Sequence, residues 1–176
     1  MRDRATHAEN QWQKERPDID TSTMALIGRL LEATHLLERN WFSPLAAHFG
    51  LHNGEFDVMA TLRRAGEPHR LTPTELYEGL MLSSGAMTSR LDRLERKGLI
   101  ERIPSQHDRR SILVGLTATG LALIDRILPL HIANEQHALA SLTQSEQAQL
   151  HTLLGTLLVG LQKSPAASPS HASRQA

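Results

Sequence analysis

Leucine-rich stripes at helical spacing dominate both ends of the chain. Residues 20–49 carry large apolar side chains every three or four positions, and Gly50 follows as a stop signal. Residues 143–163 open with a capping-box pair, Thr143 and Glu146, and carry a second stripe of leucines. Both patterns predict long amphipathic helices.

A third helical pattern covers residues 117–142 and contains Pro129. Proline removes a backbone donor and clashes with the preceding turn, so we expect a helix that is broken or bent there. The C-terminal segment 164–176 consists mostly of Ser, Ala and Pro. It has too little apolar surface to offset the entropy of ordering, which predicts a disordered tail.

Three shorter helices are predicted in the middle of the chain, each opened by a residue whose side chain can cap the first turn. The expected caps are Asn53, Thr72, and Ser83 or Ser84. The second helix has two further start signals, Pro73 and Glu75. Only a short turn separates it from the third helix, which Gly98 closes.

Two strands follow, at residues 99–104 and 111–116, joined by a polar loop. A helix-turn-helix followed by such a hairpin is a winged helix, which places its second helix in the major groove of DNA. The fold class is therefore mainly α with a small β-hairpin, a winged helix-turn-helix between long flanking helices. Those helices are more apolar than one winged domain can cover, which predicts a homodimer.

This order predicts five parts of the chain. They are an N-terminal extra helix or arm (1–22), dimerisation helices (23–50 and 117–163), a winged helix-turn-helix DNA-binding domain (51–116) and the disordered tail (164–176).

Composition excludes several classes of protein. The 176 residues are 40% hydrophobic but only 3% aromatic, so the core must be aliphatic, and the net charge is zero. The absence of cysteine excludes disulfides, thiolate zinc sites and cysteine nucleophiles. No apolar run suggests a leader or a membrane span, and no phosphate-binding, dinucleotide or nucleophile-elbow motif is present. We expect a cytoplasmic protein, not an enzyme, without cofactor, metal or membrane partner.

Positive charge is gathered locally. Between residues 90 and 110 there are seven basic residues (Arg90, Arg93, Arg96, Lys97, Arg102, Arg109, Arg110) and four acidic ones (Asp92, Glu95, Glu101, Asp108). A solvated helix face with pairs such as Asp92 and Arg96 is the alternative, but the surrounding topology favours double-stranded DNA as partner.

The expected DNA contacts are small or polar residues at the start of the helix that Ser83 or Ser84 opens, which is the second helix of the helix-turn-helix, together with Arg93 and the tip of the wing. They are Ser83, Ser84, Gly85, Met87, Thr88, Ser89, Arg93, Asp108, Arg109 and Arg110. Asp108 can hold Arg110 extended for insertion into a narrow minor groove.

The wing carries a family resemblance. Asp108-x-Arg110-x-x-x-Val114-x-Leu116-Thr117-x-x-Gly120 resembles the wing signature of MarR regulators, and LDRLERKGLIER, at residues 91–102, resembles their recognition helix and first wing strand. The resemblance implies a homodimer that binds a palindromic operator, usually as a repressor released by a small ligand.

A narrower resemblance concerns the PecS and urate-responsive branch of the same family. It is carried by WQKERPDID (12–20), EFDVMATLRRAGEPHRLTPTELY (55–77) and SGAMTSRLDRL (84–94). The branch implies an N-terminal helix with a Trp and a ligand site made of an Asp and two Arg. The matching positions are Trp12, Asp57, Arg64 and Arg90.

These four residues suit a small anionic aromatic ligand, with urate or a related purine favoured and a phenolic acid as the alternative. Asp57 and Arg64 lie about two turns apart on one helix face, whereas Arg63 points roughly 120° away. Trp12 can stack on a planar ring, and arginines donate in pairs to anions. In another interpretation, Asp57 and Arg90 form an interior ion pair and Trp12 only fills the core.

Two other hypotheses stay open. The histidines, among them His48, His52, His131, His137 and His151, could give a response to pH, although none forms a strong metal motif. A helical dimer that binds a protein partner, without specific DNA binding, is also compatible with the leucine stripe. Loss of DNA binding on removal of Arg110, with dimerisation unchanged, separates the two classes.

Overall fold

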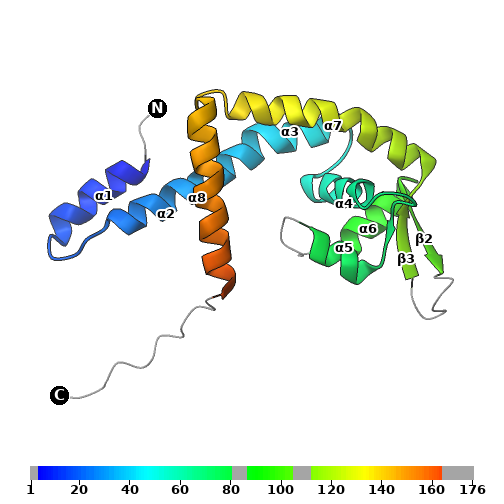
Figure 1. Ribbon diagram of the computed structural model, residues 1–176, viewed down its shortest axis with the longest axis horizontal. Helices are drawn as coiled ribbons and strands as arrows, with labels where there is room; N and C mark the ends of the chain where they lie inside the picture. The colour runs from blue at the N-terminus through cyan, green and yellow to red at the C-terminus, as the bar shows by residue number, and fades with distance from the viewer. Residues whose placement is uncertain (1–3, 81–86, 105–111, 164–176) are drawn as a thin grey trace, which may run out of the picture. The chain divides into compact units, whose positions relative to one another are not determined.

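The protein is described by a computed structural model that covers residues 4–80, 87–104 and 112–163 (Figure 1). The chain forms two compact units, Met1–Glu135 and Gln136–Ala176, which are treated separately. Among the described residues, no helix is long and apolar enough to cross a membrane.

The first unit begins with two helices that pack on each other. Helix α1 (Arg4–Glu15) is the extra N-terminal helix implied by the resemblance, and α2 (Ser22–Leu37) follows it. Arg29 of α2 donates a hydrogen bond to the Thr6 hydroxyl of α1 at 2.7 Å. The helical path predicted for residues 20–49 is confirmed from Ser22 onward.

That path contains a change of winding that the sequence pattern did not reveal. A π-helical segment, η1 (Glu38–Phe42), lies between α2 and α3 (Ser43–His48). Gly50 ends the path with a φ of +68°, a left-handed conformation that favours glycine, as predicted.

The middle of the chain folds as a helix-turn-helix with a wing, as expected. Its elements are α4 (Asn53–Arg64), β1 (Arg70–Leu71), α5 (Pro73–Gly79), α6 (Met87–Arg96), β2 (Ile100–Pro104) and β3 (Ile112–Leu116). In Figure 1, α4, α5 and α6 lie together beside β2 and β3. The capping box of Thr72 and Glu75 is present, whereas the predicted cap at Ser83 or Ser84 lies outside the described residues.

Two details of this region differ from the sequence prediction. Asn53 does not cap α4: the cap position is His52, and the Asn53 amide instead donates to the Ser43 hydroxyl at 2.8 Å. The predicted hairpin has a third strand, because β1 pairs antiparallel with β3 and gives the order β1-β3-β2. A two-residue strand is too short to show a period-two pattern.

The core is aliphatic, as the composition requires. Its fully buried members come from all three helices of the winged domain, from the sheet and from the following helix: Val58, Met59, Leu62, Leu76, Leu94, Ile100, Val114, Ile124 and Ile127. This core fixes α6 against α4 and β2.

Of the two outcomes expected at Pro129, a break is wrong and a bend stays a prediction. Helix α7 (Ala118–Ala138) passes through the proline as one element. Proline removes only its own backbone donor, so the other hydrogen bonds of a long helix remain available on both sides of it. Helix α8 (Gln144–Lys163) begins with the predicted capping box, in which Thr143 and Glu146 exchange hydrogen bonds.

Candidate functional site

Helix α6 exposes polar side chains at its start. Thr88 and Ser89 are exposed, in line with the expected DNA contacts, while Met87 is partly buried against the core. Leu91 and Leu94 anchor the helix in that core. The other residues expected at DNA, apart from Arg93, lie outside the described residues: Ser83, Ser84, Gly85, Asp108, Arg109 and Arg110.

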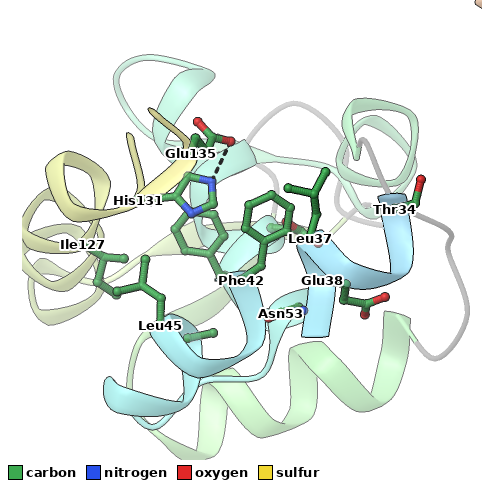
Figure 2. A pocket seen from close by; sticks show the side chains of 12 residues that line it. Thr34, Leu37, Glu38, Phe42, Leu45, Asn53, Ile127, His131 and Glu135 are labelled. Atoms are coloured by element: carbon green, nitrogen blue, oxygen red, sulfur yellow. Dashed lines mark ion pairs between the residues drawn. The ribbon is translucent and has the colours of Figure 1, made fainter. Parts of the chain in front are cut away.

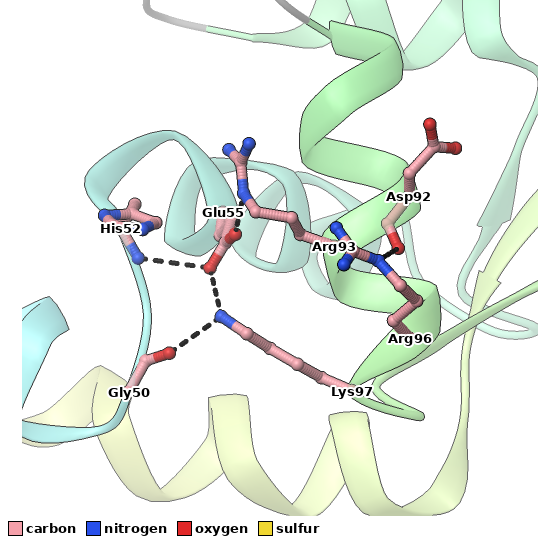
Figure 3. A network of polar contacts seen from close by, with 7 residues as sticks. All are labelled: Gly50, His52, Glu55, Asp92, Arg93, Arg96 and Lys97. Atoms are coloured by element: carbon pink, nitrogen blue, oxygen red, sulfur yellow. Dashed lines mark hydrogen bonds and ion pairs between the residues drawn. The ribbon is translucent and has the colours of Figure 1, made fainter.

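Arg93 is placed differently from the expectation that it faces DNA. Its Nε donates to Oε1 of Glu55 at 2.6 Å, and Lys97 Nζ donates to Oε2 of the same carboxylate at 2.6 Å (Figure 3). The physical reason is that Glu55 has no exposed area, and a buried carboxylate needs cationic partners. Contact between Arg93 and DNA stays a prediction.

The Glu55 carboxylate also closes the start of α4, where it accepts a hydrogen bond from the backbone N–H of His52 at 3.1 Å. Burial alone would raise the pKa of Glu55, but the hydrogen bonds from Lys97, Arg93 and His52 outweigh it and lower the pKa. Glu55 is therefore held ionised. Lys97 reaches further, to the carbonyl oxygen of Gly50 at 2.8 Å.

The opposite side of α6 is bound to the wing. Arg102 of β2 donates to Asp92 at 2.6 Å and also pairs with Glu95. Hydrogen bonding to Asp92, opposed by partial burial, raises the pKa of Arg102. The expected pair of Asp92 and Arg96 takes another form, since Arg96 bonds the backbone carbonyl of Asp92 at 3.2 Å. Much of the positive charge counted in this region is thus compensated inside the protein.

Three of the four predicted ligand residues lie close together. A cavity of about 430 Å³ is lined by Asp57 and Arg64 of α4, with Phe56, Ala60, Thr61, Arg63, Leu128 and His131. Arg90 of α6 passes directly over Gly54, where an added Cβ would lie 2.3 Å from its Nε. Arg64 bonds the carbonyl oxygen of Gly79, whereas Arg63 points to Asp125 at 2.6 Å.

Asp57 combines a buried, unpartnered oxygen with a shifted pKa. Its Oδ2 is buried and has no hydrogen-bond partner among the described residues. Burial raises the pKa of Asp57, although the positive charges of Arg90, His131 and Arg64 act in the opposite direction. A raised pKa and an unpartnered oxygen in a cavity are typical of a binding site.

A second cavity adjoins the first and shares Asp57, Phe56 and His131 with it. It measures about 250 Å³ and is mostly apolar, lined by Thr34, Leu37, Glu38, Phe42, Leu45, Ala46, Asn53, Phe56, Asp57, Ile127, His131 and Glu135 (Figure 2). The His131 ring lies 5.4 Å from that of Phe42 and 4.5 Å from that of Phe56, and its Nε2 is 3.1 Å from Glu135. Sequence reasoning missed Phe56 as a lining residue and placed His131 only in a dimerisation helix, since no local motif links α4 to α7.

Trp12 is the predicted ligand residue that the structure does not bring to this place. It lies on α1 with 45% of its surface exposed, and it lines neither cavity. Within the described parts of the chain, no group of three or more His, Asp or Glu side chains is arranged to hold a metal ion.

Comparison with known proteins agrees with this architecture. The family model described as "MarR family" matches residues 49–111. The transcriptional regulator PecS of Dickeya dadantii is 40% identical over 82% of this chain and 87% of its own, and the multiple antibiotic resistance protein MarR of Salmonella typhimurium is 36% identical over 75% and 90%. A solved structure of a mutant MarR from E. coli complexed with operator DNA has a TM-score of 0.66 at 29% identity, over 84% of this chain and 97% of that one.

These matches span the winged domain and most of the flanking helices, and they confirm the resemblance to MarR regulators and to PecS. The chain belongs to the MarR family of DNA-binding transcriptional regulators.

Proposed function

We propose that the protein is a homodimeric, ligand-responsive repressor that acts in the cytoplasm on a palindromic operator. A small anionic aromatic compound, with urate or a related purine favoured, releases it from DNA. The observation that carries this proposal is the cavity between α4 and α7, where the half-buried Asp57, with one fully buried oxygen, lies near the positive charges of Arg64 and Arg90. No catalytic role is proposed for any residue.

The two arginines supply donors for an anion, and Asp57 supplies a group that adapts to it. Because burial already raises the pKa of Asp57, a second negative charge in the cavity would favour its protonated form, which can donate a hydrogen bond to the ligand. The cavity is then compatible with a planar anion that offers several acceptors.

Arg90 connects the ligand to DNA binding. It belongs to α6, while Asp57 and Arg64 belong to α4, so a ligand held by all three would change the contact between these helices at Gly54. The ligand shifts the population away from the DNA-binding form only if it binds the displaced arrangement better. Trp12 enters the proposal as a residue that closes the site in the dimer.

Unpartnered apolar faces support a homodimer. Leu31 on α2 is 67% exposed, and on α8 the leucines at 153 and 161 are 67% and 63% exposed. Large apolar side chains exposed on each of these helices favour burial against a second copy of the chain.

A phenolic acid is the second candidate ligand. The smaller cavity favours it, because the rings of Phe42 and Phe56 and the side chains of Leu45 and Ile127 offer an apolar wall with few donors. Such a wall suits a compact aromatic compound better than a purine, which carries polar atoms around the whole edge of its ring.

The test uses duplexes selected from a random pool by the wild-type protein, because they need no knowledge of the operator. Fluorescence titrations would follow release by urate, xanthine and salicylate for the wild type, for Trp12→Phe and for Arg90→Ala. Release by urate that weakens in both variants supports the proposal. Release by salicylate alone supports the phenolic candidate, and selection of no common sequence would refute the DNA-binding proposal and favour a protein partner.

A matched pair of charge changes separates the cavity from general electrostatics. Arg64→Gln should abolish the effect of urate on DNA affinity, while Arg70→Gln removes the same charge from β1, outside the cavity, and should preserve it. Since the ligand-induced change is compared, differences in basal affinity between the variants do not affect the conclusion.

A further inference from the structure

Glu55 is a fully buried carboxylate that joins three elements. Among the described residues, it is the only acidic or basic side chain classed as buried. It stands in the first turn of α4 and pairs with two cations, Arg93 of α6 and Lys97, the residue directly after α6. Lys97 then continues to the carbonyl oxygen of Gly50, which ends the helical path from α2 to α3 (Figure 3).

We propose that Glu55 is a positioning residue that holds α6 at the angle needed to bind the protein's selected DNA sequence. By pairing with Arg93 and Lys97, it also keeps these two cations from binding the phosphates of DNA of random sequence. The proposal rests on DNA binding through α6. It assigns two consequences to one carboxylate: a fixed recognition helix, and a smaller positive charge on the surface that meets DNA.

The positioning part follows from the placement of the contacts. Arg93 and Lys97 are four residues apart, and the N–H of Lys97 donates to the carbonyl oxygen of Arg93 at 3.1 Å, so the two residues lie one turn from each other at the C-terminal end of α6. The other side is held by Arg102 of β2, which binds Asp92 and Glu95. Ion pairs therefore hold α6 on two sides. Removal of Glu55 would leave the helix held only by its ion pairs with Arg102 of the wing and by the packing of its leucines in the core.

The charge part follows from the energetics of DNA binding. Each phosphate neutralised by a lysine or arginine steepens the dependence of log affinity on log salt by about 0.9. A carboxylate that accepts from both Arg93 and Lys97 at 2.6 Å competes with phosphate for the same donors. The wild-type protein therefore has a lower affinity for random-sequence DNA than its number of basic residues suggests.

The decisive variant is Glu55→Gln, which keeps the size of the side chain and an oxygen that can accept from His52, but removes the charge. We expect its affinity for a random-sequence duplex to rise, with a salt slope steeper by up to about 2 for two freed cations. Its ratio of affinities for a selected duplex over a random duplex should fall about tenfold. A purely structural role would lower both affinities and would not steepen the slope.

The variant Glu55→Gln/Arg93→Gln/Lys97→Gln tests the two parts separately. It lacks the freed cations, so the salt slope should return to the wild-type value while the lost discrimination persists. Persistence of the steep slope would overturn the charge part. If urea denaturation shows that Glu55→Gln does not fold, Lys97→Gln is tested instead, because it keeps the pair of Glu55 and Arg93. Its ratio of affinities for the selected and random duplexes should fall, while the salt slope should not become steeper.

The outcomes also distinguish this inference from the proposed function. A wild-type protein that selects no DNA sequence would refute both. A wild-type protein that discriminates, together with a Glu55→Gln variant whose discrimination and salt slope are unchanged, would overturn the role of Glu55 and leave the proposed function intact.

Discussion

Gly120 lies in the first turn of α7, against the backbone of Leu99 between α6 and β2, and its replacement by alanine should destabilise the protein. A Cβ at this position would be 1.9 Å from the carbonyl oxygen of Leu99 and 2.9 Å from its carbonyl carbon. Both are backbone atoms, which cannot rotate away as a side chain does. Thr117 fixes the approach further, because its N–H donates to the Leu99 carbonyl at 3.1 Å and its hydroxyl to that of Gly98 at 2.7 Å.

The magnitude follows from how far the helix must move. Ordinary contact begins near 3.4 Å, so α7 would have to withdraw by about 1.5 Å from Leu99. That shift would loosen Ile124 and Ile127, both fully buried, and would stretch the Thr117 hydrogen bond. Overpacking costs about 1–3 kcal/mol and a lost hydrogen bond about 1 kcal/mol, while alanine gains about 1 kcal/mol over glycine inside a helix. We expect a net loss of about 2 kcal/mol in the free energy of unfolding.

Urea denaturation measures this loss, at one fixed protein concentration because the stability of the proposed dimer would depend on concentration. Gly28→Ala is the matched control, since its Cβ would meet Ala5 at an ordinary 3.6 Å. It should keep or raise stability by up to about 1 kcal/mol. Equal or greater stability of Gly120→Ala relative to the wild type would refute the reasoning.

Three further predictions concern charge, assembly and DNA. Burial raises the pKa of Asp57 above its ordinary 3.8, so keeping this carboxyl ionised costs stability in the folded state. Asp57→Asn should therefore increase the free energy of unfolding at pH 7, and the gain should shrink as the pH falls toward 3.8. Denaturation curves of both proteins at several pH values measure this difference. Leu153→Glu should convert the proposed dimer to a monomer in sedimentation equilibrium, and an unchanged dimer mass would exclude α8 from the interface. Arg110→Ala should weaken DNA binding in fluorescence titrations with the mass unchanged.

Local signals predicted most of the fold. The capping boxes at Thr72 and Thr143, the glycine stops at Gly50 and Gly98, and the alternating residues of β3 each specify an element from neighbours within a few positions. The missing strand of the predicted sheet involves a tertiary contact. Strand β1 forms only because β3 lies beside it.

The candidate site shows the same division. The family resemblance implies Asp57, Arg64 and Arg90 together, and helix geometry adds only the choice of Arg64 over Arg63, because Asp57 and Arg64 share one face of α4. The partnership of Glu55 with Arg93 joins residues 38 positions apart, and the contribution of His131 comes from α7. Such pairings depend on how helices pack, and a single sequence with no contact information does not contain them.

Two carboxyl groups of α4 lie near cations of α6 and its end but differ in their partners, and the difference suggests how the helix would respond to the proposed ligand. Glu55 is saturated by cations, which lower its pKa, and it binds the C-terminal part of α6 through Arg93 and Lys97. Asp57 keeps an unpartnered oxygen, has a raised pKa and lies near Arg90, closer to the start of the same helix. A ligand at Asp57 would therefore act on one end of α6 while Glu55 holds the other, so the expected motion is a tilt about the held end. A tilt moves Thr88 and Ser89, at the exposed start of the helix, further than it moves Lys97, and these are the positions expected to meet DNA bases.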